Sequence, residues 1–240
     1  MTNEIIETAK ATQEVAKATK KGLEVAEKLG GFFAKVLGEP VETAAGILGD
    51  KLRFMRWERQ IRIVDRAEEI NSKRGISGKE IPVPPKLAIP IIENASLEEN
   101  DYLQDLWVKL LSSAQGHETS GSVRAAFIDI IKQLEVIDVR LLNLIFNSYS
   151  KAVSENVITP ESSPTKVAFP KTEIIKHLGI SEKIYENSVD NLMRVRCLCS
   201  EVKIIQGIGL GGEKPTIDKG YESICITSLG VGFVLACIKE

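Results

Sequence analysis

Residues 96–116, SLEENDYLQDLWVKLLSSAQG, decide the fold class, because their apolar side chains recur at the spacing of one α-helical face. This face consists of Leu103, Leu106, Trp107, Leu110, Leu111 and Ala114. Ser96 and Glu99 have the spacing of a capping box at a helix N-terminus. Gly116 is a stop signal at the other end. We therefore predict a helix over residues 97–115 that buries one face.

The chain before this helix is also predicted to be helical. Residues 3–37 carry an apolar stripe, and a longer helix is predicted over residues 41–74, where Gly75 supplies the stop. Residues 75–90 then contain four prolines, which predict an extended linker that leads into a short helix.

After residue 116 the predicted secondary structure changes part-way along the chain, from helices alone to a mixture of helices and strands. Helices are predicted over residues 122–134 and 138–149, followed by a polar loop to residue 166. Beyond it we expect a short helix, a second helix capped by Ser181, two strands around a glycine-rich turn, and a strand that passes through Thr227 and Gly230 into an apolar helix. This is the order of a winged helix. We predict a mainly α protein with a multi-helix domain over residues 1–150 and a small α+β winged-helix-like domain over residues 167–240.

The composition is that of an ordinary globular chain. Its 240 residues include 31 Lys and Arg against 33 Asp and Glu, so the net charge of -2 gives no strong overall attraction to nucleic acid or anionic membranes. The N-terminus lacks the apolar core of a signal peptide, and the apolar stretch at residues 223–238 is shorter than a spanning helix requires. We expect a cytoplasmic protein with four reduced cysteines.

Two motifs suggest sites that their context does not support. Residues 207–212, GIGLGG, match a dinucleotide-binding fingerprint, but a strand is expected after them where that fingerprint needs a helix. Cys197 and Cys199 lack the spacing of a zinc knuckle, and they are better explained as small buried side chains. The two histidines, His117 and His177, have no evident catalytic partners. We expect no cofactor, no metal and no enzyme activity.

Opposite charges collect on two of the predicted helices. Residues 51–74 hold eight basic and four acidic side chains, a net +4, whereas residues 93–118 hold six acidic side chains and one lysine, a net -5. Arg59, Arg62 and Arg66 share one side of the first helix and form a candidate phosphate-binding or partner-binding surface. We favour the alternative that the two helices pack with their charged edges adjacent and compensate each other.

The expected recognition helix of the winged-helix-like domain has a poor surface for DNA. Glu182, Glu186 and Asp190 balance Lys183, Arg194 and Arg196, and the acids dominate the half that would enter the groove. Arg194 and Arg196 complete the candidate interaction surface. Protein contact, or a purely structural role, is therefore favoured over sequence-specific DNA binding.

The segment of residues 22–49 offers a further alternative. Its apolar side includes Phe32, Phe33, Val36 and Leu37, which would suit membrane binding at the lipid surface. We favour the ordinary arrangement, in which a helix buries this stripe against its neighbours. The Phe32–Phe33 region and the face that carries Phe54, Trp57, Ile61 and Val64 also suggest self-association.

Three stretches of the chain resemble the bacterial abortive-infection alpha family. They are GEPVETAAGILGDKLRFMRWERQIRIVDRAEEI at residues 38–70, IPVPPKLAIPIIENASLEENDYLQDLWVKLLSSA at 81–114 and FIDIIKQLEVIDVRLL at 127–142. The most specific parts are residues 85–90, the run at 92–96 and Trp107 with Leu110 and Leu111. The resemblance covers residues 35–200 and implies a role in anti-phage defence, without catalytic residues to carry over.

Three functions remain open from the sequence. The favoured one is a non-enzymatic defence component that acts through contacts with a phage or host protein. The alternatives are a winged-helix nucleic-acid-binding regulator and a membrane-active effector that uses residues 22–49. Self-association into a homo-oligomer is expected as well.

Overall fold

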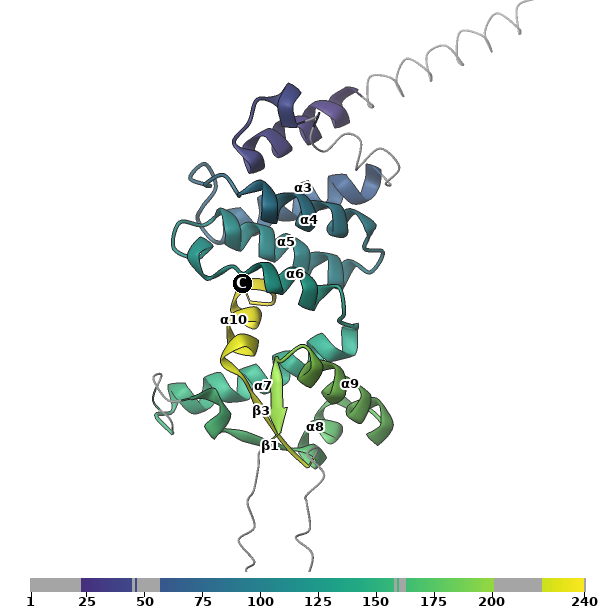
Figure 1. Cartoon of the computed structure of the whole chain (residues 1–240), viewed down its shortest axis with the longest axis vertical. Coiled ribbons are helices and arrows are strands. Elements are labelled where there is room, and N and C mark those ends of the chain that lie inside the picture. Colours follow the sequence, from purple (N-terminus) through teal and green to yellow (C-terminus); the bar gives the residue numbers. More distant parts are fainter. Residues whose placement is uncertain are drawn as a thin grey trace, which may run out of the picture. The chain divides into compact units, whose positions relative to one another are not determined.

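The computed structural model describes residues 23–44, 46, 57–157, 159, 163–200 and 222–239 (Figure 1). The chain forms two compact units, which we call the N-terminal unit (residues 1–121) and the C-terminal unit (residues 122–240). The boundary therefore lies before the expected one at residue 150.

The N-terminal unit is a set of packed helices. Residues 23–37 and 41–44 are helical, followed by α3 (Trp57–Lys73), α4 (Pro85–Leu97) and α5 (Asp101–Gln115). The short 3-10 helix η1 (Ser120–Ser122) contains the boundary between the units. Helices α3, α4 and α5 all contact one another and run side by side in Figure 1. The core between them includes Val64, Ile92, Trp107, Leu110 and Leu111. Of the long helix predicted over residues 41–74, positions 45 and 47–56 lie outside the described residues.

Two predictions for this unit are wrong in detail. The proline-rich segment is extended only as far as Pro84, and the rest of it belongs to α4. Pro85 occupies the first turn, where a missing N–H costs nothing, and the helix tolerates Pro90 in its interior. Ser96 is not an N-cap but lies within α4, where its hydroxyl donates to the Ile92 carbonyl at 2.8 Å. The cap of α5 is Asn100, whose side chain accepts from the N–H groups of the first turn.

The C-terminal unit is built around one long helix. It contains α6 (Ala125–Ile131), α7 (Val136–Ser154), η2 (Pro164–Lys166), β1 (Ala168–Pro170), α8 (Lys171–Leu178), α9 (Glu182–Arg194), β2 (Leu198–Ser200), β3 (Ser223–Ile226) and α10 (Ser228–Cys237). Helix α7 contacts α8, α9, α10 and β3, and Phe127 of α6 packs edge-on against Phe233 of α10. Because their partners lie in this unit, α6 and α7 belong to it and not to the preceding domain.

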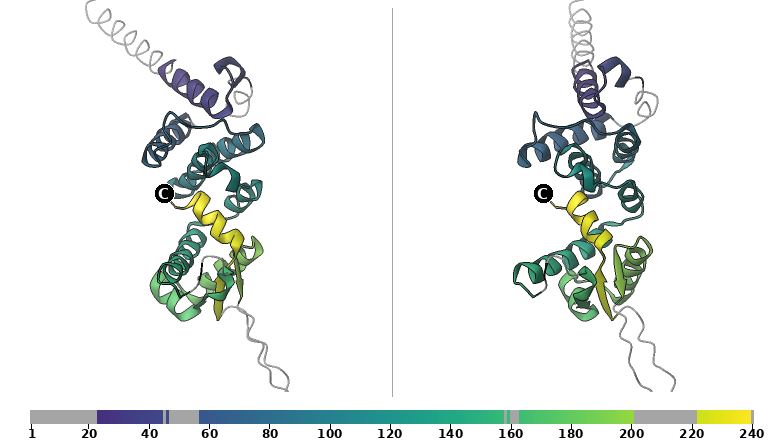
Figure 2. Two further views of the ribbon diagram at one scale, coloured as in Figure 1. Left: turned by 90° about the vertical axis from the view of Figure 1, so that its left-hand side faces the viewer. Right: turned by 60° about the vertical axis from the view of Figure 1, so that its left-hand side comes forward.

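A small antiparallel sheet completes the C-terminal unit. Its strand order is β1-β3-β2, with Cys225 opposite both Ala168 and Cys199. The Ser181 cap of α9 is confirmed, whereas Thr227 is the N-cap of α10 and not part of a strand. Figure 2 shows α10 continuing from the end of β3. The fold class of a mainly α chain with a small α+β part is confirmed; the glycine-rich segment 207–212 lies outside the described residues.

Candidate functional site

The arginine row of α3 faces the acidic edge of α5. Arg59 forms a short ion pair with Asp101, and Arg62 approaches Asp105 to 2.9 Å. Arg66 binds Asp105 through two nitrogens, at 3.2 and 2.6 Å. The opposite charges that the sequence places on these two helices therefore compensate each other, as favoured above.

Neutral acceptors and backbone carbonyls extend the same row. Arg59 also donates to the Glu99 carbonyl, and Arg62 donates to Gln104 Oε1 at 2.7 Å. The hydrogen bond to Asp105 raises the pKa of Arg66 above its ordinary range, and the hydrogen bond from Arg59 lowers the pKa of Asp101. The three arginines thus hold α3 against α5, and their charges are largely satisfied within the N-terminal unit.

The other two residues of the predicted surface lie in the C-terminal unit. Arg194, near the end of α9, donates to Gln133 and to Asn191 Oδ1. Arg196 is exposed with a φ of 61°, and its carbonyl accepts from the Thr227 hydroxyl at 2.7 Å. The structure therefore places three of the five arginines in a row on α3. The other two, Arg194 and Arg196, lie at the end of α9 and just after it.

A charged cluster around Lys171 was not predicted from the sequence. Its ammonium group binds Glu182 and lies 3.3 Å from Glu186 and 3.8 Å from Glu222. The hydrogen bond to Glu182 raises the pKa of Lys171, and burial raises the pKa of the neighbouring Tyr185 to about 12. One signal was available, because Glu182 and Glu186 are four residues apart and share one side of a helix. The cluster ties α8 to α9 and so fixes which face of α9 is exposed.

The cysteines lie where small apolar side chains are expected. Cys197, Cys225 and Cys237 are buried, and burial raises the pKa of the Cys197 thiol to about 12, which suppresses its nucleophilic form. His117 and His177 are exposed. Within the described ranges, no group of three or more His, Cys, Asp and Glu side chains is placed to hold a metal ion.

Comparison with protein families identifies the chain. The family described as abortive infection alpha matches residues 58–237, from the second residue of α3 to the end of α10. The chain belongs to the abortive infection alpha family. The match starts later than the resemblance seen in the sequence and extends through both units. Comparisons with curated proteins and with solved structures returned no match.

Family membership gives the protein a role in abortive infection, a form of phage defence. The matched region contains Arg59, Arg62 and Arg66 as well as the Lys171 cluster. Among the helices that the structure describes, none is long and apolar enough to cross a membrane.

Proposed function

We propose that the chain is a non-enzymatic, cytoplasmic component of abortive-infection defence that contacts a phage or host protein through α9. The family match supplies the defence role. The order β1, α8, α9, β2, β3 and the three-stranded antiparallel sheet support a winged-helix interpretation of this part of the chain. In such a unit α9 takes the position of the recognition helix.

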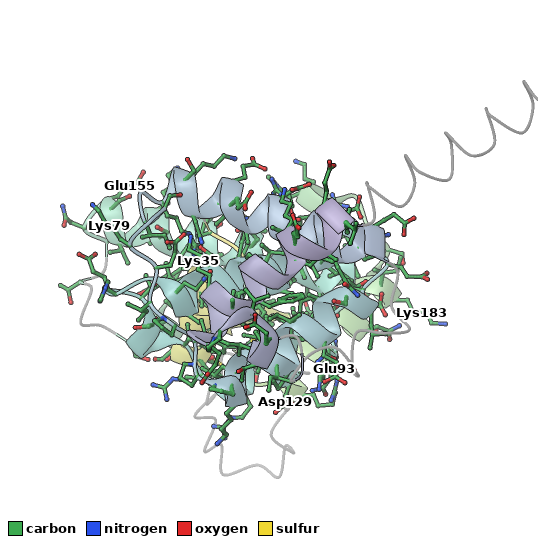
Figure 3. The ribbon with its side chains drawn as sticks, turned by 90° about the horizontal axis from the view of Figure 1, so that it is seen from above. Lys35, Lys79, Glu93, Asp129, Glu155 and Lys183 are labelled. Atoms are coloured by element: carbon green, nitrogen blue, oxygen red, sulfur yellow. The ribbon has the colours of Figure 1, made fainter. Side chains whose placement is uncertain are left out.

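The exposed face of α9 carries this proposal. Ile184 is 44% exposed, and Glu182 and Lys183 beside it are exposed too; Figure 3 shows Lys183 projecting away from the ribbon. A helix that enters a DNA groove needs cations to meet phosphates, but this half of α9 has Glu182 and Glu186 against a single lysine. An isoleucine flanked by charges of both signs suits a protein partner better.

The main cationic surface proposed for nucleic-acid binding is already occupied by ion pairs. Arg59, Arg62 and Arg66 bind carboxylates of α5, so a phosphate would have to compete with an ion pair at each position. Arg194 and Arg196 are then the remaining members of the candidate set. Two cations give a weak and strongly salt-dependent interaction.

The apolar side chains on which the membrane alternative rests are covered in the part of residues 22–49 that the structure describes. Phe32, Phe33, Val36 and Leu37 are all buried, as the favoured arrangement of this helix requires. Their burial also leaves Phe32 and Phe33 little exposed surface for self-association. The Trp57 side chain, on which the other part of that expectation rests, lies outside the described residues, so the homo-oligomer stays a proposal.

Phage challenge of bacteria that express single variants tests the proposal. We expect Ile184→Asp to reduce protection by at least about tenfold in plating efficiency, since an aspartate at the centre of a contact removes well over 1.4 kcal/mol of binding. Val157→Asp is the matched control, because Val157 is 71% exposed in the same unit and outside α9. It should protect as well as the wild type.

Two further measurements separate the alternatives. Both variants should have the wild-type melting temperature, because both replaced side chains are exposed. Full protection by Ile184→Asp would contradict the proposal. Binding of the wild type to duplex DNA at low salt, with a steep loss as salt is added, would favour the nucleic-acid alternative instead.

A further inference from the structure

A polar pocket opens in the N-terminal unit, and none of the three arginines of the α3 row lines it. It has a volume of about 240 Å³ and lies between the helix of residues 23–37, α3, the segment before α4 and the end of α5. Its polar lining includes Glu27, Lys35, Glu68, Asn71, Glu80 and Gln115. Lys35 is labelled in Figure 3.

Two buried oxygens in the lining accept no hydrogen bond from the described residues. They are Asn71 Oδ1 and Glu80 Oε2. Asn71 is 3% exposed, and its amide nitrogen donates to Gln115 Oε1 at 3.2 Å, whereas the Glu80 side chain is 4% exposed and its other oxygen accepts from Lys35 at 2.6 Å. A buried acceptor without a donor is costly, so native structures retain few of them. Two in one pocket indicate a ligand that supplies donors.

The charge of the pocket is negative. Three carboxylates, Glu27, Glu68 and Glu80, line it against two lysines, a net of -1. Both lysines are already paired, Lys28 with Asp65 at 2.5 Å and Lys35 with Glu80. Although burial acts to raise the pKa of Glu80, the hydrogen bond from Lys35 leads the opposing effects, which outweigh burial and lower that pKa, so Glu80 stays ionised near neutral pH.

We propose that this pocket binds a small organic cation with a guanidinium or amidinium group. Such a planar group carries several N–H donors in a fixed fork, so one group supplies enough donors for both Glu80 Oε2 and Asn71 Oδ1. Phe32 also lines the pocket and offers an aromatic surface to the cation or its apolar stem. This site is independent of the protein contact proposed for α9.

Calorimetry on the full chain tests the site with a pair of matched probes, butylguanidine and butylurea. They differ in the charge and in one donor group. We expect butylguanidine to bind saturably at millimolar concentration or below and to raise the melting temperature, and butylurea to bind at least about tenfold more weakly. Equal affinity for the two probes, or no saturation by butylguanidine up to about 10 mM, would overturn the proposal.

Three variants locate the binding. Glu80→Gln should weaken butylguanidine at least about tenfold, and Asn71→Asp, which adds a carboxylate at the second oxygen, should strengthen it by a similar factor. Asn71→Asp keeps the proposal testable if Glu80→Gln folds poorly, because Gln115 can rotate its amide to donate to the new carboxylate. Glu58→Gln, an exposed position on the same helix as Asn71, is the control and should change nothing. Unchanged affinity in Asn71→Asp would contradict the assignment.

A last comparison distinguishes the two sources of such a group. An acetylated and amidated Gly-Arg-Gly peptide presents the same guanidinium on a polypeptide. Tighter binding of this peptide than of butylguanidine would identify the ligand as an arginine side chain of a partner. Weaker binding would identify it as a free small molecule.

Discussion

The two units bury polar side chains to different extents. Within the described residues the N-terminal unit buries seven of them and the C-terminal unit three. The first set is Gln60, Asn71, Ser96, Gln104, Ser112, Ser113 and Gln115, and the second is Asp138, Lys171 and Ser188. The core of the C-terminal unit is instead dominated by aromatic, aliphatic and thiol side chains, such as the Phe127–Phe233 pair.

This difference shows how each unit fixes its packing. In the N-terminal unit, directional bonds set the register of the helices: Gln104 donates to the Ala95 carbonyl at 2.7 Å, and Arg74 donates to the hydroxyls of Ser112 and Ser113. In the C-terminal unit, close approach of Gly230 in α10 to the Cys197 carbonyl also fixes the packing, beside the ion pairs of the Lys171 cluster. Asn71 Oδ1 and Glu80 Oε2 are buried in the N-terminal unit but accept no hydrogen bond from the described residues, so they are exceptions to this pattern. The proposed ligand rests on these two exceptions.

The chain provides separate probes for the two units. Both tryptophans, Trp57 and Trp107, lie in the N-terminal unit, and the four cysteines all lie in the C-terminal unit. Tryptophan fluorescence therefore follows unfolding of the first unit, and the reaction of the thiols with a chromogenic disulfide follows unfolding of the second.

The largest effect is expected for Gly230→Ala in α10. A Cβ atom at Gly230 would lie 2.2 Å from the Cys197 carbonyl oxygen, and a backbone atom cannot rotate away from it. We expect the free energy of unfolding of the C-terminal unit to fall by about 3 kcal/mol, at the upper end of the usual cost of overpacking. Thiol exposure in a denaturant series measures it.

Gly232→Ala in the same helix is the control for this variant. Its Cβ would meet Phe127 at 3.6 Å, an ordinary contact, so this change should be neutral or slightly stabilising. Equal stability of the two variants would show that the close approach of α10 to Cys197 does not fix the packing of the unit. Tryptophan fluorescence should report little change in either variant.

Helical periodicity predicted most of the elements, because it depends on neighbours in the sequence. The face of α5 with Trp107 and Leu110 and the Ser181 cap of α9 are examples. The unit boundary was not predictable in this way, since an apolar face such as that of α7 has the same pattern whichever unit covers it. The capping-box spacing of Ser96 and Glu99 placed the cap of α5 at Ser96, although Asn100, four residues later, is an equally good cap by residue type.

The site was predictable only where charge patterns reveal it. The net charges of residues 51–74 and 93–118 have opposite signs, which was enough to expect pairing of Arg59 and Arg66 with α5. The neighbours of Asn71 and Glu80 in the sequence give no sign that these residues line a pocket, because their partners come from segments up to 45 residues away along the chain. Tertiary contacts between distant polar residues leave no periodic signal in one sequence.

A smaller effect is expected from the ion pairs between α3 and α5. Asp105 binds both Arg62 and Arg66 and is only 21% exposed, so Asp105→Asn leaves two part-buried guanidinium groups with weaker acceptors. We expect a loss of about 1–2 kcal/mol in the N-terminal unit, between the values of exposed and buried pairs. Fluorescence-detected unfolding measures it, and the thiol signal should not move.

The matched control for Asp105→Asn is Glu69→Gln. Glu69 also binds Arg66, but it is 44% exposed, so its loss should cost much less than the loss of Asp105. The cost of Asp105→Asn should shrink as salt is added, yet persist in part because burial limits screening. An equal cost for both variants would mean that burial of the pair contributes nothing.

The smallest effect is a pH dependence of the unfolding free energy of the N-terminal unit. The pKa of Glu80 is lowered from its ordinary value of 4.5 in the folded chain, so the unfolded chain takes up the proton first and the stabilisation is lost as pH falls through the folded pKa. The difference in unfolding free energy between the wild type and Glu80→Gln should thus be greatest near neutral pH and shrink below pH 4.5. Tryptophan fluorescence at a series of pH values measures it, with Glu58→Gln as the control that keeps the wild-type profile. A constant difference from neutral pH to about pH 3 would show that the ionised form of Glu80 is not the stabilising one, and would weaken the case for a cation-binding pocket beside it.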